Sequence, residues 1–171
     1  MERLWAPWRM AYILAGEEVS DICIFCKFPS EGAANFRERL ILAANDRAFA
    51  MMNKYPYNNG HVMVIPRVHV ADPAELDDED YRATTDLLRK ATIAVRAALG
   101  AQGFNLGMNL GRVAGAGIDK HCHYHVVPRW NGDTNFMPVV GDAKVLSEAV
   151  ADTYERLLPA FAAIPGVVAP S

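Results

Sequence analysis

The stretch His121-Cys-His-Tyr-His-Val-Val-Pro-Arg129 decides how the rest of the chain is interpreted. It holds three of the five histidines of the protein, at every second position of a run that is rich in aromatic and β-branched residues. Such a run, stopped by Pro128, predicts a β-strand, in which alternate side chains share one face at intervals of roughly 6.5–7 Å. Three aligned imidazoles suit metal binding, proton transfer or attack on an electrophile better than they suit a hydrophobic core.

The composition is that of an ordinary globular chain. Its 171 residues predict one domain with its own core, and a net charge of −3 gives no basic footprint for duplex nucleic acid. No apolar run approaches the roughly 20 residues that cross a bilayer. The segment Met1 to Arg9 lacks a signal-peptide pattern. We therefore expect a cytoplasmic protein without a membrane or nucleic-acid partner.

Strand patterns outnumber helix patterns along the chain. The five expected strands are 39–44, 47–53, 61–66, 104–110 and the histidine strand 121–129. An acidic start at 75–80, followed by apolar residues at helical spacing, predicts a helix that ends at Leu99 before Gly100. A closing helix is expected over 143–161. This order predicts an α+β fold with one mainly antiparallel five-stranded sheet and two main helices.

A single domain over 1–171 follows from this interpretation. An N-terminal arm over 1–36 includes Cys-x-x-Cys and a loop with Pro29 to Asn35. Its aromatic-rich residues 2–12 are expected to pack onto the body, with a second subunit as the alternative. The core is expected over 37–161. The tail 162–171 is expected to fray.

Cys23 and Cys26 stand at a spacing that supplies half of a tetrahedral zinc site. Three cysteines do not make a disulfide framework, and in a reducing compartment this spacing indicates metal or redox chemistry. The other half of a zinc site would come from His69 and His121, which would close it as a structural site. Packed or free thiols and a redox pair are the alternatives. Cys122 is expected on the opposite face of the strand, as a small buried residue.

Glycines at 111, 115 and 117 give the histidine strand a flexible leading loop. Backbone N–H groups of such a loop can bind a phosphate, although a loop alone is more often only a connection. Beside aligned histidines the anion-binding interpretation is favoured. A neutral imidazole can attack phosphorus through one ring nitrogen while an acceptor orients the N–H of the other. Neighbouring donors then offset charge on the non-bridging oxygens.

Several motifs resemble one known family. His121 to Val127 resembles the His-φ-His-φ-His-φ-φ signature, in which φ is apolar, of the histidine-triad (HIT) nucleotide hydrolases and transferases. The resemblance runs from about residue 3 to about residue 160 and includes the segments Leu4–Met10, Tyr55–Pro66, Phe104–Gly111 and His125–Phe136. Tyr55–Pro66 looks like a strand–turn–Gly-His–strand element of the family, and the other three segments look most like its bacterial diadenosine polyphosphate phosphorylase branch.

The resemblance implies a role for individual residues. His123 would be the catalytic nucleophile that forms a nucleotidyl-imidazole intermediate. His125, also catalytic, would hydrogen-bond the α-phosphate or the bridging oxygen. The other nucleotide-binding positions that the resemblance implies are Asn53 for the ribose, Asn109, Ala116 and Gly117 for the phosphates, and Trp130 for the second nucleoside or the product end.

The resemblance also bears on metal and assembly. In zinc-bearing relatives the ligands fall at positions like Cys23, Cys26, His69 and His121, which is the set already reached from spacing, and no organic cofactor is implied. Family members are generally homodimers whose two sheets join into one, so an extended sheet across a homodimer is expected here. The implied substrate is a dinucleoside polyphosphate, with AMP or ADP as a product.

One segment departs from the family pattern. Many relatives place Ser, Thr or Gln at the position of Gly117 or Ile118, whereas this chain reads Ala116-Gly-Ile-Asp-Lys120, so backbone N–H groups or Lys120 would have to compensate. The chemistry at His123 is the same for water and for orthophosphate, so the sequence does not separate a hydrolase from a phosphorylase. Two further functions stay open. One is a catalytic metal held by the three triad histidines, and the other is a nucleotide-binding sensor or scaffold with little turnover.

Overall fold

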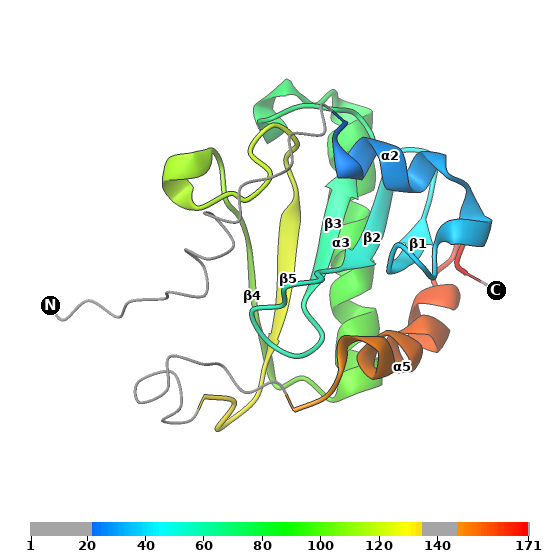
Figure 1. The fold of residues 1–171 in the computed structure, drawn as a ribbon, viewed down its shortest axis with the longest axis vertical. Helices are drawn as coiled ribbons and strands as arrows, with labels where there is room; N and C mark the ends of the chain where they lie inside the picture. Colours follow the sequence, from blue (N-terminus) through cyan, green and yellow to red (C-terminus); the bar gives the residue numbers. More distant parts are fainter. Residues whose placement is uncertain (1–21, 135–146, 171) are drawn as a thin grey trace, which may run out of the picture.

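The computed structural model describes residues 22–134 and 147–170. The expected motif Leu4–Met10 lies outside these residues, as do 143–146 of the expected closing helix and Phe136 at the end of the last motif. Within the described ranges the chain forms one sheet with a helix pair on one face and a short helix on the other (Figure 1).

All neighbouring strands of the sheet are antiparallel, and their order is β1-β2-β3-β5-β4. Their bounds are Ile41–Ala44 for β1, Ala48–Met52 for β2, Val62–Pro66 for β3, Gly103–Met108 for β4 and Tyr124–Arg129 for β5. The sheet confirms the predicted α+β fold. Because β5 lies between β3 and β4, the histidine segment approaches the sheet next to a central strand.

Two helices cover one face of the sheet (Figure 1). Helix α3, Asp78–Leu99, packs on β2, β3 and β5, and helix α5, Val150–Ala162, packs on β1 and α3. Gly100 ends α3 in the left-handed conformation with φ 64°, as the sequence predicted. Leu87, Leu157 and Phe161 lie in the main buried cluster between these helices and the sheet. Among the described helices, none has the length and apolar character to cross a membrane.

The other face of the sheet is covered by helix α2, Ile24–Ser30. A smaller buried cluster lies there, and its members are Phe25, Phe36, Ile41, Ala44, Phe49, Met51, Met63 and Ile65. Strands β1, β2 and β3 are buried along their whole length because both faces are covered. His125 pairs with Met63 across β5 and β3, so its side chain lies on this second face.

The histidine segment differs from the prediction at its start. Strand β5 begins at Tyr124 instead of residue 121, and Tyr124 is its first residue paired with either neighbour, with Val64 on β3 and Met108 on β4 opposite it. Before Tyr124 the backbone hydrogen-bonds to a different segment, since the Cys122 N–H donates to the Val70 carbonyl at 2.7 Å. Cys122 is buried, as expected.

Two segments near the ends of the described ranges also differ from the prediction. The loop expected around Pro29 begins as helix α2, which is stabilised by burial of Phe25 and Pro29 one turn apart. At the other end, the tail that was expected to fray forms a β-bridge to the edge of the sheet. The backbone groups of Val168 and Ala44 exchange two hydrogen bonds of 2.7 and 2.8 Å there.

The two predicted helices start later than expected. A 3₁₀ turn over Pro73–Glu75 precedes α3, and Asp77 caps α3 by accepting the N–H of Asp80. Helix α5 starts at Val150. Glu148 precedes this helix, and its carboxylate accepts a hydrogen bond from the Thr153 hydroxyl of the first turn at 2.7 Å.

Candidate functional site

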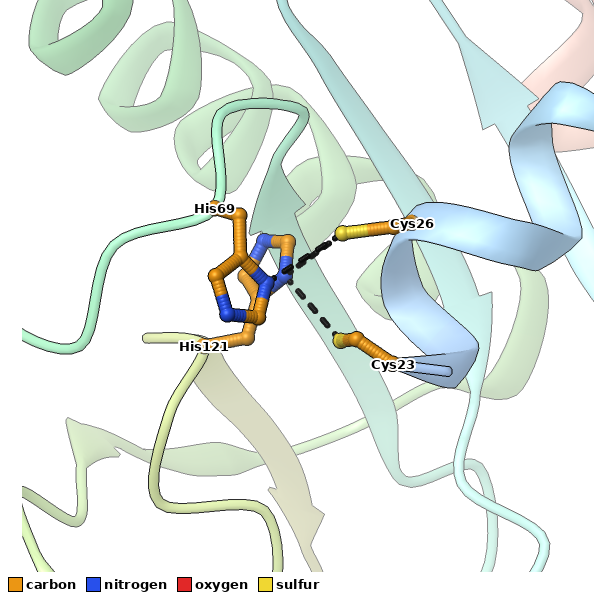
Figure 2. A group of neighbouring side chains, drawn as sticks. All are labelled: Cys23, Cys26, His69 and His121. Atoms are coloured by element: carbon orange, nitrogen blue, oxygen red, sulfur yellow. Dashed lines mark hydrogen bonds between the residues drawn. The ribbon is translucent and has the colours of Figure 1, made fainter. Parts of the chain in front are cut away.

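Four side chains from three separate segments meet beside helix α2 (Figure 2). Cys23 and Cys26 come from the start of α2, His69 from the loop after β3, and His121 from the segment before β5. One sulfur or nitrogen atom from each lies within 4.8 Å of all the others. The shortest separations are 3.2 Å from Cys26 Sγ to His69 Nδ1 and 3.4 Å from Cys23 Sγ to His121 Nδ1.

These separations fit a tetrahedral metal site. With Zn–S of about 2.3 Å and Zn–N of about 2.0–2.1 Å, tetrahedral ligands lie about 3.4–3.8 Å apart. His121 is also oriented as a ligand, because its Nε2–H donates to the Pro66 carbonyl at 2.9 Å and this leaves the lone pair on Nδ1. Burial lowers the pKa of His121, which favours the neutral ring that a metal requires. The four residues can therefore hold a metal ion.

The thiols would have to lose their protons to bind an ion. Burial, together with the neighbouring Cys23, raises the pKa of Cys26 to about 11. A bound cation reverses this preference because it stabilises both thiolates. Binding of a cation by this donor set would therefore release protons.

His123 is held so that one ring nitrogen is available for chemistry. Its Nδ1–H donates to the backbone carbonyl of His121 at 2.9 Å, so Nε2 carries the lone pair. Burial lowers the pKa of His123, whose side chain is 5% exposed, and this keeps the ring neutral. The His123 ring meets the His125 ring edge to face, with 4.9 Å between centroids.

His61, which directly precedes β3, orients His125. The backbone N–H of Tyr57 donates to His61 Nδ1 at 3.1 Å, so His61 carries its proton on Nε2. That Nε2 lies 3.0 Å from His125 Nδ1 and donates to it, which places the His125 proton on Nε2. The pair therefore presents a proton donor next to the bare nitrogen of His123.

Tyr57 covers the His61–His125 pair. Its ring stacks on His61 with 4.7 Å between centroids and on His125 with 5.4 Å. Tyr57 is 40% exposed, so it lies between the buried histidine pair and solvent. Neither His61 nor Tyr57 was singled out as a site residue from the sequence. The available signal was a histidine directly before an apolar strand, and a lone histidine in that setting is usually structural.

Two of the expected nucleotide-binding residues lie beside the histidines. The Asn53 amide nitrogen is 3.4 Å from His61 Nδ1, and the Asn109 amide nitrogen is 3.5 Å from His125 Nε2. In the glycine loop, the Ala116 N–H donates to the Gly111 carbonyl at 3.3 Å, so it is engaged within the loop, while Gly117 is exposed.

Trp130 lies away from this group, because it follows the far end of β5. Its indole N–H donates to the Gly100 carbonyl at 3.2 Å. With Asn59, Leu99, Ser147 and Arg156 it lines a separate cavity of about 290 Å³. Of the residues predicted for the site, the chain thus brings the histidines and two asparagines together, and leaves Trp130 apart.

Comparison with known proteins agrees with this geometry. The HIT domain family model matches residues 37–132. An AP-4-A phosphorylase of Mycobacterium tuberculosis is 34% identical over 172 residues, which cover 96% of this chain and 87% of that protein. The adenosine 5'-monophosphoramidase hnt1 of Schizosaccharomyces pombe is 33% identical over 109 residues, which cover 64% of this chain and 75% of that protein.

A solved structure shares the fold. The crystal structure of a Zn-bound histidine triad family protein from Mycobacterium smegmatis has a TM-score of 0.65 and 25% identity, and covers 84% of this chain and 95% of that one. The matched family model spans the sheet and the histidine segment, and the M. tuberculosis relative extends the likeness over nearly the whole chain. The chain therefore belongs to the HIT family of nucleotide hydrolases and transferases.

Proposed function

We propose that this protein cleaves a dinucleoside polyphosphate at an α-phosphate through a nucleotidyl-His123 intermediate. The observation that carries the proposal is the pairing of two ring nitrogens with opposite roles. His123 Nε2 carries a lone pair because its Nδ1–H is bound to the His121 carbonyl. His125 Nε2 carries a proton because its Nδ1 faces His61 Nε2.

The first half of the reaction follows from these protonation states. His123 Nε2 attacks the α-phosphorus, a P–N bond forms, and the P–O bond to the leaving phosphate breaks. His125 Nε2–H donates a hydrogen bond to the departing bridging oxygen and keeps its proton, because a neutral imidazole that gave up its one N–H would become an anion. Burial of His123 favours this step because a neutral ring is the nucleophile.

In the second half an acceptor oxygen attacks the phosphorus and the P–N bond breaks. The electron pair of that bond returns to His123 Nε2, and a proton of the attacking water or orthophosphate passes to a phosphate oxygen of the product or to solvent, so both histidines end in their starting states. Asn53 is proposed to bind the ribose and Asn109 the phosphates, since both amides lie within 3.5 Å of the histidines. With the Ala116 N–H engaged inside the loop, phosphate contacts from this segment would come from the region of Gly117.

We assign the four-ligand cluster to structural zinc. Three sulfur–nitrogen separations of 3.2–3.6 Å, in a set of four ligand atoms that all lie within 4.8 Å of one another, support this assignment, and one relative of known structure is described as Zn-bound. The set closes the coordination shell with protein ligands, so the ion would brace the fold and leave the chemistry to His123 and His125. Reduced thiols fit the reducing conditions of the cytoplasm, where we place the protein.

We favour orthophosphate as the acceptor because the M. tuberculosis relative is named an AP-4-A phosphorylase. The test is incubation with diadenosine tetraphosphate, with and without orthophosphate. ADP and ATP formed only with phosphate identify a phosphorylase, whereas AMP and ATP formed without it identify a hydrolase. Absence of any product, together with measurable AMP binding, would favour a nucleotide sensor instead.

A second candidate activity comes from the S. pombe relative, which is named an adenosine 5'-monophosphoramidase. Attack of His123 on phosphorus would release an amine from a nucleoside phosphoramidate by the same two steps. Adenosine 5'-phosphoramidate should therefore be assayed beside the dinucleotide. If kcat/KM is much higher for the phosphoramidate than for the dinucleotide, the phosphoramidate is the preferred substrate.

We propose a homodimer that extends the sheet through β4. This strand lies at the sheet edge opposite the edge that Val168 covers. Leu106 on β4 is 51% exposed, and Leu110 just beyond it is 41% exposed, which is unusual for an edge strand facing water. Sedimentation equilibrium of the wild type and of Leu106→Lys tests this, since a wild-type monomer would refute the dimer.

A further inference from the structure

Phe25 links the four-ligand cluster to His123. It stands between Cys23 and Cys26 on helix α2 and is 1% exposed. Its ring contacts His121 edge to face, with 5.5 Å between centroids, and contacts His123 with 5.1 Å between centroids at a 58° tilt. One side chain therefore lies against a ligand ring and against the proposed nucleophile.

Helix α2 has little intrinsic stability. It has seven residues and no side-chain hydrogen bond at its N-cap, and it contains Pro29. Helices much shorter than about 12 residues are marginal in water, so their position depends on tertiary contacts. At the start of α2 these contacts are Phe25 itself and the two thiols against His69 and His121.

Without a cation, the contacts of the thiols are weak, because an S–H group is a poor hydrogen-bond donor. A cation held by two sulfurs and two nitrogens would fix α2 to the His121 segment through strong bonds. The position of Phe25 would then be set by the occupied site.

The His123 ring depends on the same two segments. Its Nδ1–H is bound to the His121 carbonyl, and its face is packed by Phe25, so both restraints come from residues next to ligands. In-line attack on phosphorus requires the nucleophilic nitrogen to be held closely, since a displacement of about 1 Å can cost about 100-fold in rate.

We propose that Phe25 is a positioning residue that transmits occupation of the Cys23–Cys26–His69–His121 site to the ring of His123. The catalytic consequence rests on the proposed function of His123, whereas the contact itself does not. The cation then affects turnover by orienting the nucleophile, without contacting the substrate. Loss of the cation and loss of the Phe25 ring should therefore both change the environment of the His123 ring, which its NMR signal reports.

The test compares Phe25→Leu with Phe49→Leu. Phe49 is a matched control because it is 0% exposed, belongs to the same cluster and contacts Phe25 with 6.5 Å between centroids. Histidine ring signals are recorded by NMR on protein labelled with ¹³C-histidine, and His123 is assigned with His123→Ala. Zinc content, kcat and KM for diadenosine tetraphosphate with orthophosphate are measured on the same samples.

Phe25→Leu should shift the His123 ring signal because a neighbouring aromatic ring current is lost. It should also lower kcat by about tenfold with little change in KM, while each chain keeps one zinc. Phe49→Leu should leave the His123 signal and kcat close to wild type. An unshifted His123 signal in Phe25→Leu, or equal changes in both variants, would overturn the proposal. If Phe25→Leu does not fold, Phe25→Met replaces it.

A second arm needs no variant. Zinc is removed from the wild type with a chelator and then restored, and the His123 signal and its cross-relaxation with Phe25 are followed. The proposal expects the signal to move and the cross-relaxation to weaken on removal, with both restored by zinc. An unchanged His123 environment in metal-free, folded protein would refute it. Absence of turnover on any nucleotide would refute the proposed function. The spectra would still show whether Phe25 couples occupation of the metal site to the His123 ring.

Discussion

The two faces of the sheet are built for different tasks. Among the described residues, the face under α3 and α5 carries seventeen buried members in its hydrophobic cluster, whereas the face under α2 carries eight. The α2 face adds buried imidazoles, with His121, His123 and His125 all under 9% exposed. Apolar burial stabilises a fold roughly in proportion to area, so most of the stability comes from the first face, while the second face holds the candidate site.

Burying imidazoles costs stability, and the structure shows how the cost is offset. Each of these rings has a defined partner: the Pro66 carbonyl for His121, the His121 carbonyl for His123 and the His61 ring for His125. A buried polar group that is hydrogen-bonded loses little relative to water. The larger apolar face can therefore support a smaller polar face whose groups are oriented for reaction.

The largest expected effect comes from His123→Ala. Removing the nucleophile should lower kcat by about 10⁴-fold or more. The ring packs on the smaller face, so the thermal midpoint should change by only a few degrees, and AMP binding should persist. Steady-state kinetics with diadenosine tetraphosphate and a thermal melt measure the two effects. Turnover close to wild type would refute the nucleophile assignment.

Leu157→Ala should lower stability and leave turnover nearly unchanged, the reverse of His123→Ala. Leu157 is fully buried on α5 within the larger cluster, so its truncation should lower the free energy of unfolding by about 2–5 kcal/mol. The turnover of the molecules that remain folded should stay within about twofold of wild type. Leu158→Ala is the control, because Leu158 is only partly buried and should cost less. Urea titration and active-site normalised kinetics separate the two quantities, and a large loss of kcat would show that the faces are not independent.

His61→Leu tests the orientation of His125 and should lower kcat by about 10- to 100-fold, because the donor to His125 Nδ1 is lost. His61→Gln should recover part of this loss, since its amide N–H can occupy the place of Nε2–H. The kinetics of the two variants are compared at equal folded fraction. Equal activity of the Leu variant and wild type would remove His61 from the mechanism.

Much of the sheet could be predicted from local patterns. Alternation and turn residues indicated all five strands, and Gly100 marked the end of α3 because a left-handed residue stops a helix. The spacing of Cys23 and Cys26 indicated half of a donor set, and the structure places His69 and His121 beside them. These features are local, so the sequence carries them without knowledge of the fold.

The remaining features depend on contacts between distant segments. His61 faces His125 only because β3 pairs with β5 in the register Met63 to His125, which no local pattern defines. Helix α2 forms because Phe25 and Pro29 are buried against the sheet, although its seven residues would not hold a helix alone. The bridge from Val168 to Ala44 likewise depends on tertiary packing, which the Pro165-Gly166 start of the tail did not indicate.

The smallest expected effect is on the cap of α3, which belongs entirely to the stabilising face. The Asp77 carboxylate accepts the N–H of Asp80 at 2.7 Å, so Asp77→Ala should lower the free energy of unfolding by about 1 kcal/mol. Asp78→Ala removes an exposed first-turn charge but keeps the cap, so it should lower the free energy of unfolding by only about 0.3 kcal/mol. Neither change should alter kcat or zinc content, because α3 packs on the face opposite the histidines. A fall in kcat with Asp77→Ala beyond its loss of folded protein would mean that α3 also sets the geometry of the α2 face, and the division between the two faces would have to be abandoned.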